Sequence, residues 1–343
     1  MSDISTTSNS FSKSQTSFQS NYTLPDIHGK RDFKLSSLVS VNQLNKLAVE
    51  HIITRATNIK KNPIKYNKLA KGKLMYTLFF ANSTRTRFST ETAWTKLGGT
   101  IISMSDATST SVTKGETLDH TLRMFTGYCP DFIAIRTKEE FVAHYGCSNF
   151  EDISWINCGD GSNEHPTQAM LDIFTIQENF ATHFEDNKTA ELKIAFVGDI
   201  KHGRTIKSLA KVLKMFNIQM TFVAPESLHA QAEIEVEGIV YDKKDITELA
   251  QVIAKSDVIY CTRPQLERMS DEDKNIYSNG VYQITKEMMG DSKVLIMHPL
   301  PIDSSKMPEI HSELDKDARS IYFQQAANGL WTRMSIFSLL MGI

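Results

Sequence analysis

A run of hydroxyl and guanidinium side chains stands at residues 83–87, which read Ser83-Thr84-Arg85-Thr86-Arg87. It follows an apolar, strand-like stretch at 74–80 and precedes a helical pattern that ends at Gly98-Gly99. Such a turn would direct three hydroxyls, backbone N–H groups, the positive end of a helix dipole and two guanidiniums at one point. A lone Ser-Thr pair would be interpreted as an ordinary helix N-cap beside surface arginines. Five polar residues at one turn favour a phosphate-binding site.

A second polar cluster, Gly198-Asp199-Ile200-Lys201-His202-Gly203-Arg204-Thr205, follows the apolar run 193–197 and opens another helical stretch. It departs from the nucleotide-binding P-loop because Arg204 stands where that pattern requires lysine. A planar guanidinium suits a carboxylate better than the phosphates of a nucleotide. We therefore expect Arg204 to bind a carboxylate, with an exposed surface arginine as the alternative.

Further polar residues follow other strand-like runs or loops. They are Arg136 after 131–135, His165-Pro166-Thr167-Gln168 after a Gly-rich turn, and Arg263-Pro264-Gln265 after 257–260. Singly, each is as typical of a structural or solvent-exposed residue as of a ligand-binding one. The turn His298-Pro299-Leu300-Pro301 is expected to be rigid and to expose backbone carbonyls.

The elements that would position these residues alternate along the chain from about residue 33. Strand-like apolar runs stand at 74–80, 100–104, 131–135, 193–197, 219–223, 257–260 and 294–297. Alternation with helical patterns predicts an α/β protein with parallel sheets, whose ligands bind at the carboxyl ends of the strands. Residues 165–180 are predicted to form the helix that joins two sheets. Residues 322–340 are predicted to form a last helix that packs against a domain.

Composition narrows the class of protein. At 343 residues the chain exceeds the usual size of one hydrophobic core, which favours two domains. A formal net charge of −2 argues against nucleic acid as a partner, and no apolar run approaches the ~20 residues of a membrane span. The four cysteines lie far apart, and no secretory leader is recognised. We therefore expect free thiols in a reducing compartment, without disulfides or structural zinc.

Residues 1–24 contain eight serines and four threonines and are predicted to be a disordered tail. An organellar transit peptide is the alternative. It is disfavoured because the segment has no arginine, in which such presequences are rich.

Taken together, the motifs resemble the aspartate and ornithine carbamoyltransferase family, and its aspartate branch in particular. They occur in the family's order from about residue 33 to the C-terminus. The matches are 83–87, Ser111-Val112-Thr113-Lys114-Gly115-Glu116-Thr117, 165–168, 198–199 with 203–205, Arg263 with Gln265, 298–301 and Tyr322-Phe323-Gln324-Gln325.

The resemblance implies a pyrimidine-pathway enzyme that transfers the carbamoyl group of carbamoyl phosphate to the α-amine of L-aspartate, with no metal or cofactor. It implies a carbamoyl phosphate-binding domain at 33–165, completed by a helix at 320–343, and an aspartate-binding domain at 166–319. The tail would occupy 1–32. We expect a cytoplasmic homotrimer with shared active sites, because in the family the loop that matches Ser111 and Lys114 enters the neighbouring subunit's site.

The resemblance also implies residue roles that agree with the physical interpretation. Carbamoyl phosphate would be bound by Ser83, Thr84, Arg85, Thr86, Arg136, His165, Gln168, the carbonyls of Pro299 and Leu300, and the neighbour's Ser111 and Lys114. Aspartate would be bound by Lys114, Arg204, Arg263 and Gln265. The catalytic groups would be Arg85, Thr86, Lys114, Arg136 and His165. The leaving phosphate could take up the amine proton, so a carboxylate base is not required.

Four places depart from the family's pattern, one of them the segment 303–308, which differs from the usual acidic turn. Ala81-Asn82 stands where an acidic residue and proline are usual, Ile302 stands where the family has arginine, and Thr137-Lys138 replaces His-Pro. In the family the acidic residue links the two domains when the cleft closes, through arginines that match Arg204 and Arg268.

These departures leave an alternative open, in which the chain is a low-activity homologue that acts as a regulatory or scaffolding subunit. Transfer to ornithine is disfavoured, because Arg263 and Gln265 suit a carboxylate side chain and would repel an ammonium group.

Overall fold

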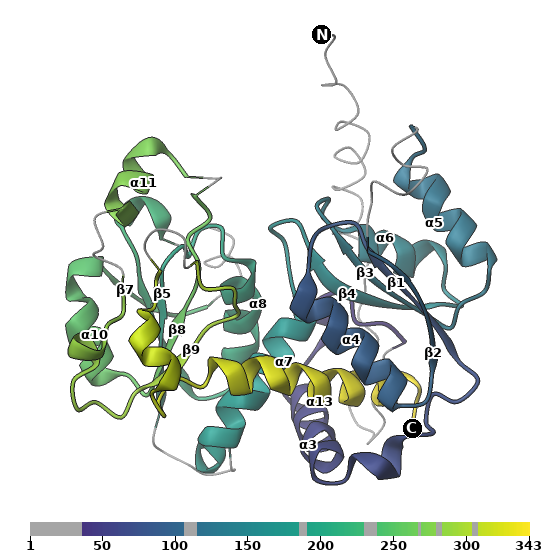
Figure 1. Ribbon diagram of the computed structural model, residues 1–343, viewed down its shortest axis with the longest axis horizontal. Coiled ribbons are helices and arrows are strands. Elements are labelled where there is room, and N and C mark those ends of the chain that lie inside the picture. The colour runs from purple at the N-terminus through teal and green to yellow at the C-terminus, as the bar shows by residue number, and fades with distance from the viewer. Residues whose placement is uncertain are drawn as a thin grey trace.

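The computed structural model describes residues 36–105, 115–184, 191–229, 239–266, 269–278, 283–303 and 308–343. It contains two parallel sheets, one of four strands and one of five, in two lobes that lie side by side (Figure 1). The prediction of an α/β protein with two parallel-sheet units joined by helices is therefore confirmed. The tail predicted at 1–32 lies outside the described residues.

The first sheet has the strand order β2-β1-β3-β4. Its strands are β1 (Leu74–Phe79), β2 (Thr100–Met104), β3 (Phe132–Thr137) and β4 (Ser154–Asp160). Side chains of β1 alternate between two hydrophobic clusters, with Met75 and Phe79 in one and Tyr76 and Leu78 in the other. Helices cover both faces, which is why the central strands are apolar along nearly their whole length.

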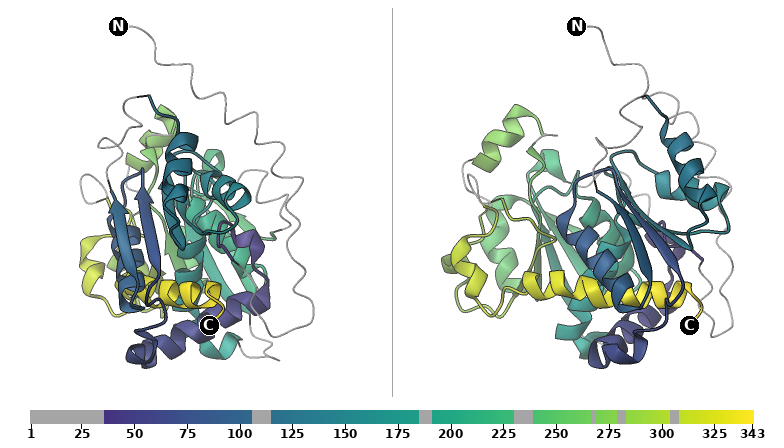
Figure 2. Two further views of the ribbon diagram at one scale, coloured as in Figure 1. Left: turned by 90° about the vertical axis from the view of Figure 1, so that its right-hand side faces the viewer. Right: turned by 45° about the vertical axis from the view of Figure 1, so that its right-hand side comes forward.

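The helices of this lobe are α3 (Lys46–Lys61), α4 (Thr84–Lys96), α5 (Leu118–Gly127) and α6 (Val142–Asn149). Leu122 of α5 and Val142 of α6 belong to the cluster on one face of the sheet. Trp94 of α4 lies on the other face, with its ring centre 4.8 Å from that of Phe132. The two views of Figure 2 show these helices on opposite sides of the sheet.

The second sheet has the order β7-β6-β5-β8-β9, again with parallel pairs. Its strands are β5 (Leu192–Val197), β6 (Ile218–Val223), β7 (Asp242–Lys244), β8 (Val258–Cys261) and β9 (Leu295–Met297). The accompanying helices are α8 (Arg204–Leu213), α10 (Leu249–Lys255), α11 (Asp271–Ser278) and α12 (Lys286–Met289). Its strands and those of the first sheet contribute to one continuous hydrophobic cluster.

Two long helices connect the lobes. Helix α7 (Pro166–Asn179) follows β4 and packs against α8, α3 and α13 (Tyr322–Leu340). Helix α13, yellow in Figure 1, runs from β9 in one lobe to α3 and α4 in the other. The predictions of a joining helix at 165–180 and a last, packed helix at 322–340 are confirmed. Neither the boundary at residue 165 nor the one at 319 is tested by this packing, so both remain predictions.

Polar contacts also cross between the lobes at the start of α7. Nζ of Lys211 on α8 lies 3.0 Å from Oε1 of Glu164, and both side chains are buried. The backbone N–H of His165 donates to Oγ of Ser208 on the same helix at 3.0 Å. The residues at the beginning of α7 are therefore held directly against α8 of the second lobe.

Two strands were missed in the sequence. Strand β4 carries polar residues that interrupt its apolar pattern, but Asn157 is fully buried and its Nδ2 donates to Val39 O at 2.9 Å. Strand β7 is a three-residue edge strand that contains Asp242 and Lys243, and charged residues are common at sheet edges. The remaining short 3₁₀ helices are Val41–Gln43, Pro63–Tyr66, Ala181–Phe184, Glu226–Leu228, Ile246–Glu248 and Ser312–Lys316.

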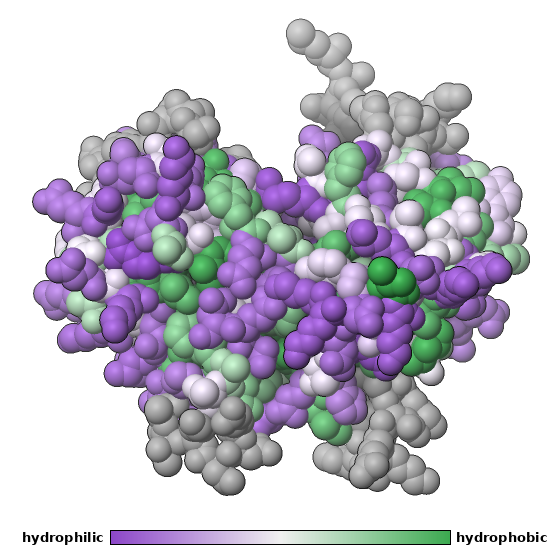
Figure 3. Space-filling model, turned by 60° about the horizontal axis from the view of Figure 1, so that its bottom comes forward, coloured by the Kyte–Doolittle hydropathy of each residue, from purple (hydrophilic) through white to green (hydrophobic). Residues whose placement is uncertain are grey.

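The surface seen in Figure 3 is largely hydrophilic, with hydrophobic residues in small separate patches. None of the helices in the described part of the chain is long and apolar enough to cross a membrane.

Candidate active site

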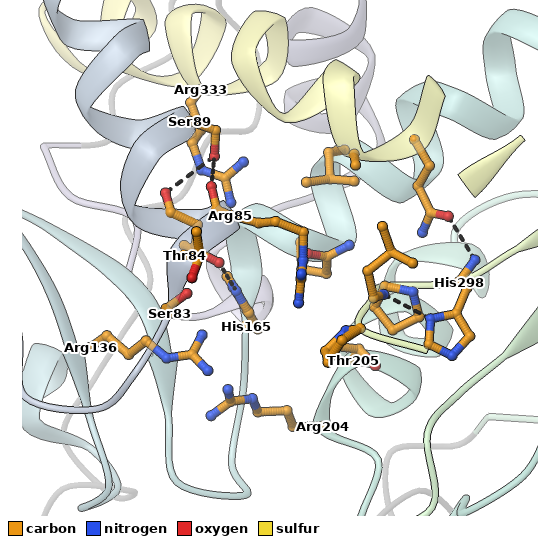
Figure 4. Close-up of a pocket in the computed structure, with 18 of the residues that line it drawn as sticks. Ser83, Thr84, Arg85, Ser89, Arg136, His165, Arg204, Thr205, His298 and Arg333 are labelled. Atoms are coloured by element: carbon orange, nitrogen blue, oxygen red, sulfur yellow. Dashed lines mark hydrogen bonds between the residues drawn. The ribbon is translucent and has the colours of Figure 1, made fainter. Parts of the chain in front are cut away.

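A pocket of about 500 Å³ opens at the carboxyl ends of strands from both sheets. Its lining comes from the segments that follow β1, β5 and β9, from β3, and from α7 and α13. The lining residues are 82–86, Ser89, Arg136, His165, Gln168, Leu171, Arg204, Thr205, 298–301, Gln325, Ala326 and Arg333. Figure 4 shows side chains from these elements converging on one space. No aspartate or glutamate is among these described lining residues, so the site favours anions.

The start of α4 forms one wall of the pocket. Ser83 is the N-cap residue, with extended backbone, and its side chain makes no capping hydrogen bond. Ser83, Thr84 and Thr86 all line the pocket. The first N–H groups of a helix have no acceptors within that helix, so this end of α4 offers hydrogen-bond donors and a positive dipole to an anion.

The two arginines of this turn point in different directions. Arg85 lines the pocket, whereas Nε of Arg87 lies 3.8 Å from Oε1 of Glu91 and its guanidinium 5.1 Å from the centre of the Phe88 ring. The prediction that both guanidiniums face one point was therefore wrong. The ion pair of Arg87 with Glu91, one turn further along α4, directs its guanidinium along the helix surface.

Arg136 faces the start of α4 from β3. Its NH1 donates to Cys158 O at 3.2 Å, and its Nε is buried without a hydrogen-bond partner. Burial, together with the positive charges of Arg204, Arg85 and Arg333, lowers the pKa of Arg136 to about 9. These arginines repel one another, and no acidic residue of the lining offsets their charge. An anion that binds among them therefore stabilises their charged forms.

His165 lies at the centre of these cations (Figure 4). Its Nε2 lies 3.3 Å from Oγ1 of Thr86. Burial lowers the pKa of His165 well below its usual value, with further contributions from Arg204, Arg136 and Arg333. The imidazole is therefore neutral near pH 7, and a neutral imidazole has one N–H donor and one acceptor.

A buried carboxylate organises the opposite wall. Oδ1 of Asp172 accepts from Nε2 of Gln168 at 2.9 Å and from Nε2 of Gln325 at 2.6 Å, and Oδ2 accepts from the Tyr260 hydroxyl at 2.7 Å. Burial raises the pKa of Asp172 to about 7, against the effect of these donors. Because the carboxylate accepts, the amide oxygen of Gln168 is left for other partners, and Gln168 lines the pocket.

The turn after β9 forms part of the pocket wall. Pro299 and Leu300 line it, and Leu300 has a positive φ of 56°. Leu300 N donates to Nδ1 of His298 at 2.8 Å, and His298 N donates to Oε1 of Gln325 at 2.8 Å. Nδ1 of His298 therefore accepts, and its Nε2 donates to Oε1 of Glu309 at 2.8 Å. These bonds hold the left-handed backbone of Leu300, which costs free energy in a residue with a side chain.

Arg204 reaches the pocket from the start of α8. Its NH1 donates to Gly161 O at 2.7 Å, which links the second lobe to the loop after β4. Gln265 lies beside this segment, since its N–H donates to Oδ2 of Asp199 at 3.1 Å and its Nε2 to His202 O at 2.5 Å. Arg263 and Gln265 are not among the residues that line the pocket, so the structure brings Arg204, but not these two, to the other site residues.

Sequence reasoning missed Arg333, which lines the pocket from α13 with 2% of its surface exposed. Burial lowers its pKa to about 10. The available signal was an isolated guanidinium in the otherwise uncharged stretch 330–341, because a buried arginine is rare unless it is paired. Thr205 and Gln325 were quoted within motifs, but no role was assigned to them.

Some predicted residues cannot be placed. Ser111, Lys114 and Arg268 lie outside the described residues. Among the residues that the structure does describe, no group of three or more His, Cys, Asp and Glu side chains could hold a metal ion. The four cysteines are free thiols, two of them buried.

Comparison with protein families finds two matches in succession. Residues 36–178 match the carbamoyl-P binding domain of aspartate/ornithine carbamoyltransferases, and residues 190–340 match the Asp/Orn binding domain of the same family. Each match contains one of the two sheets.

Similar proteins extend over nearly the whole chain. The aspartate carbamoyltransferase catalytic subunit of Thermococcus kodakarensis is 37% identical over 321 residues, which cover 91% of this chain and 99% of that protein. The corresponding subunit of Methanococcus maripaludis is 38% identical and covers 88% of this chain and 97% of its own length.

Solved structures agree with the sequence comparisons. The catalytic subunit of aspartate transcarbamoylase from M. jannaschii superposes with a TM-score of 0.77 at 36% identity, covering 89% of this chain and 98% of that chain. Aspartate transcarbamoylase from Trypanosoma cruzi, in complex with N-(phosphonacetyl)-L-aspartic acid, gives 0.77 at 30% identity, with coverages of 88% and 94%. On these matches over both lobes, the chain belongs to the aspartate/ornithine carbamoyltransferase family.

Proposed function

We propose that the chain transfers the carbamoyl group of carbamoyl phosphate to the α-amine of L-aspartate, giving N-carbamoyl-L-aspartate and phosphate for pyrimidine synthesis. The observation that carries the proposal is the pocket in which the start of α4 meets Arg136, His165 and Arg204 without an acidic lining residue. The similar Trypanosoma cruzi enzyme has been solved with carbamoyl phosphate and aspartate, at a TM-score of 0.76 and 29% identity.

The start of α4 is suited to the phosphate of carbamoyl phosphate. Ser83, Thr84 and Thr86 supply hydroxyls, the first turn supplies backbone N–H groups, and Arg85 supplies a guanidinium. A phosphate group at a helix N-terminus gains from all three kinds of donor. The same donors stabilise the phosphate as a leaving group, because negative charge grows on it as the bond to carbon breaks.

The carbamoyl group would then lie between a wall of hydrogen-bond donors and a wall of hydrogen-bond acceptors. Arg136, Thr86 and His165 present donors suited to the carbonyl oxygen, on which negative charge develops during attack. The amide oxygen of Gln168 and the carbonyls of Pro299 and Leu300 present acceptors suited to the carbamoyl NH2.

Arg204 is proposed to bind a carboxylate of aspartate, together with Arg263 and Gln265. The backbone N–H of Gln265 donates to Asp199 in the segment that leads to Arg204, which holds the two segments next to each other. Lys114 would complete this site, and Ser111 and Lys114 would also contact carbamoyl phosphate, both from a neighbouring subunit. The proposed assembly is therefore a homotrimer with shared sites.

The reaction needs two anions to be held in contact. The neutral α-amine of aspartate attacks the carbamoyl carbon and forms a C–N bond. The bond between the carbamoyl carbon and the bridging oxygen of the phosphate breaks. The phosphate leaves with the bonding electron pair and can accept the proton released by the amine. The pocket contributes mainly proximity and preorganised positive charge.

We further propose that residues 33–165 with the helix 320–343 form the carbamoyl phosphate-binding domain and that residues 166–319 form the aspartate-binding domain. Helix α13 supports this division, because it packs on α3 and α4 of the first lobe. A cytoplasmic location is proposed from the four free cysteines, since reducing compartments keep thiols unpaired.

A second candidate function is a weakly active subunit that binds carbamoyl phosphate and regulates or scaffolds others. The observation that favours it is the pair of departures at Ala81 and Ile302. Ile302 packs against the hydrophobic cluster, where the family's arginine would place a charge.

A steady-state assay for carbamoylated product, with carbamoyl phosphate and either L-aspartate or L-ornithine, separates these functions. We expect saturable formation of N-carbamoyl-L-aspartate and no product from ornithine. Product from ornithine would overturn the substrate assignment. Binding of carbamoyl phosphate without turnover of either amino acid would favour the second candidate.

A further inference from the structure

Four buried side chains, at the starts of α4 and α7 and on α13, form a continuous hydrogen-bonded chain at the edge of the pocket. We propose that Thr167, oriented by Arg333, fixes the tautomer of neutral His165, so that the proton lies on Nε2 and faces the reacting carbonyl. The facing carbonyl rests on the proposed function, whereas the tautomer can be measured without any catalysis.

The contacts run from Arg333 on α13 through Thr167 and His165 to Thr86 on α4. NH2 of Arg333 donates to Oγ1 of Thr167 at 3.1 Å. That oxygen lies 3.5 Å from Nδ1 of His165, and Nε2 of His165 lies 3.3 Å from Oγ1 of Thr86. All four residues are at most 7% exposed, and Thr167, at the centre of the chain, is 1% exposed.

The direction of each bond follows from what the groups can donate. A guanidinium has no acceptor, so the oxygen of Thr167 must accept from Arg333. The single proton of the Thr167 hydroxyl is then free to point at Nδ1 of His165. Within the described residues this hydroxyl has bonds to Arg333 and His165 alone, so the proton has no other protein acceptor. Nδ1 therefore accepts, and the ring proton lies on Nε2.

Thr86 cannot make this choice. Its hydroxyl can accept from Nε2–H or donate to a bare Nε2, so it fits either tautomer. The opposite tautomer would place Nδ1–H against the oxygen of Thr167 and leave the proton of that hydroxyl unpaired in a buried site, which is unfavourable. The choice between the two tautomers is therefore made at Nδ1, where His165 meets Thr167.

The tautomer matters because His165 stays neutral. Burial and the charges of Arg204, Arg136 and Arg333 lower its pKa, so the ring offers one donor instead of two. With the proton on Nε2, that donor faces Thr86 and the pocket. With the proton on Nδ1, a lone pair would face the carbonyl oxygen and repel its developing charge. Thr167 and Arg333 are thus positioning residues for a group that contacts substrate.

Thr167→Val is the main test, because it removes the hydroxyl but keeps the shape of the side chain. Thr167→Ser keeps the hydroxyl and is the matched control. The readout is the ¹⁵N spectrum of the full-length protein with labelled histidine, in which protonated and bare ring nitrogens have well-separated shifts. The chain has ten histidines, so the His165 signals are assigned from their loss in His165→Gln.

We expect a protonated Nε2 and a bare Nδ1 in the parent and in Thr167→Ser, and a mixture or reversal in Thr167→Val. Thr167→Ala serves as a second hydroxyl-free variant if the valine does not fold. A parent spectrum with the proton on Nδ1, or an unchanged spectrum in the folded hydroxyl-free variant, would overturn the proposal.

Kinetics of the same variants distinguish a tautomer effect from a binding defect. We expect kcat of Thr167→Val to fall ~10-fold or more with little change in the KM for carbamoyl phosphate, since loss of a donor to a developing oxyanion lowers kcat. Thr167→Ser should stay near the parent. An equal loss in both variants would contradict the role of the hydroxyl. If no variant and no parent catalyses the reaction, the proposed function fails while the spectra still decide the tautomer.

Discussion

Nε2 of His165 lies 3.3 Å from Oγ1 of Thr86, although the two residues are 79 positions apart in the chain. The contact joins the start of α7 to the start of α4, so the groups suited to a carbonyl oxygen stand beside those suited to a phosphate. His165 is itself held by Ser208 of the second lobe. One short set of contacts therefore aligns both lobes at the pocket.

Arg85→Ala should lower kcat by ~10²-fold or more while the protein stays folded. Arg85 lines the pocket from the helix N-terminus and is an exposed residue, and loss of a donor to transition-state charge typically has an effect of this size. Arg87→Ala is the matched control, because its guanidinium points to Glu91 and Phe88 on the other side of α4. Steady-state rates and circular dichroism of both variants check this. Normal turnover of Arg85→Ala at saturating carbamoyl phosphate would contradict the phosphate assignment.

Ala81→Glu should lower the KM for aspartate and leave the KM for carbamoyl phosphate nearly unchanged. Arg204 currently bridges the lobes through a bond to the neutral Gly161 carbonyl. A carboxylate at position 81 would add a charge-assisted bond on closure, worth about 1.5–3 kcal/mol, which corresponds to about one to two powers of ten in a closing equilibrium.

Ala81→Gln is the control for this variant, since it has the length of glutamate without the charge. Initial rates against aspartate concentration, for the parent and both variants, decide the matter. An unchanged or higher KM in Ala81→Glu would mean that Asn82 or a nearby acidic residue already supplies the link.

Shared active sites predict complementation between two inactive chains. Lys114→Ala and Arg85→Ala chains, mixed under conditions that exchange subunits, should regain part of the activity, because some interfaces then carry both intact residues. Native mass spectrometry verifies the exchange. Hybrids that form but show no more activity than either parent variant would place Lys114 and Arg85 in the same subunit's site, or Lys114 outside it.

Asp172→Asn should change how stability depends on pH. Burial raises the folded-state pKa of Asp172 to about 7, above that of the unfolded chain. Between about pH 4 and 7 the folded state therefore binds more protons, and the free energy of unfolding falls as pH rises through this window. Asparagine does not titrate. The free energy of unfolding of Asp172→Asn should therefore rise relative to that of the parent, by up to about 1.4 kcal/mol per pH unit, and this relative change should level off above pH 7.

Urea unfolding of the parent and the variant at fixed protein concentration, from pH 5 to 8, measures this difference. Tyr260→Phe is a useful companion, because it removes one donor to the carboxylate and should shift the window to higher pH. A difference between parent and Asp172→Asn that does not vary with pH would show that Asp172 ionises normally in the folded protein.

The sequence by itself determined the class of fold and the place of the site. Apolar runs that alternate with helical patterns predicted parallel sheets, and the bounds of β2 and α13 agree with the predicted ranges. These signals are local, because a strand or helix that packs on a neighbour must repeat its apolar residues with its own period. Polar residues after strands were predicted to meet, and residues 83–86, Arg136, His165 and Arg204 do meet in the pocket.

Patterns of this kind fail where polar atoms are satisfied by distant partners. Strand β4 was missed because Asn157 interrupts its apolar run, and only the folded chain shows that its amide donates to Val39. The direction of Arg87 was also missed, since residue type does not say which side of a helix faces the pocket.

The tertiary structure alone decided the protonation and orientation of the groups that would act. Asp172 lies 88 positions from Tyr260 and 153 from Gln325, yet one carboxylate orients the amides on one wall of the pocket. Arg333 and Thr167 are 166 positions apart and meet behind His165. Burial, dielectric environment and donor direction are properties of such assembled neighbours. The pKa of His165 and the tautomer proposed for it therefore depend on packing, which no single stretch of sequence contains.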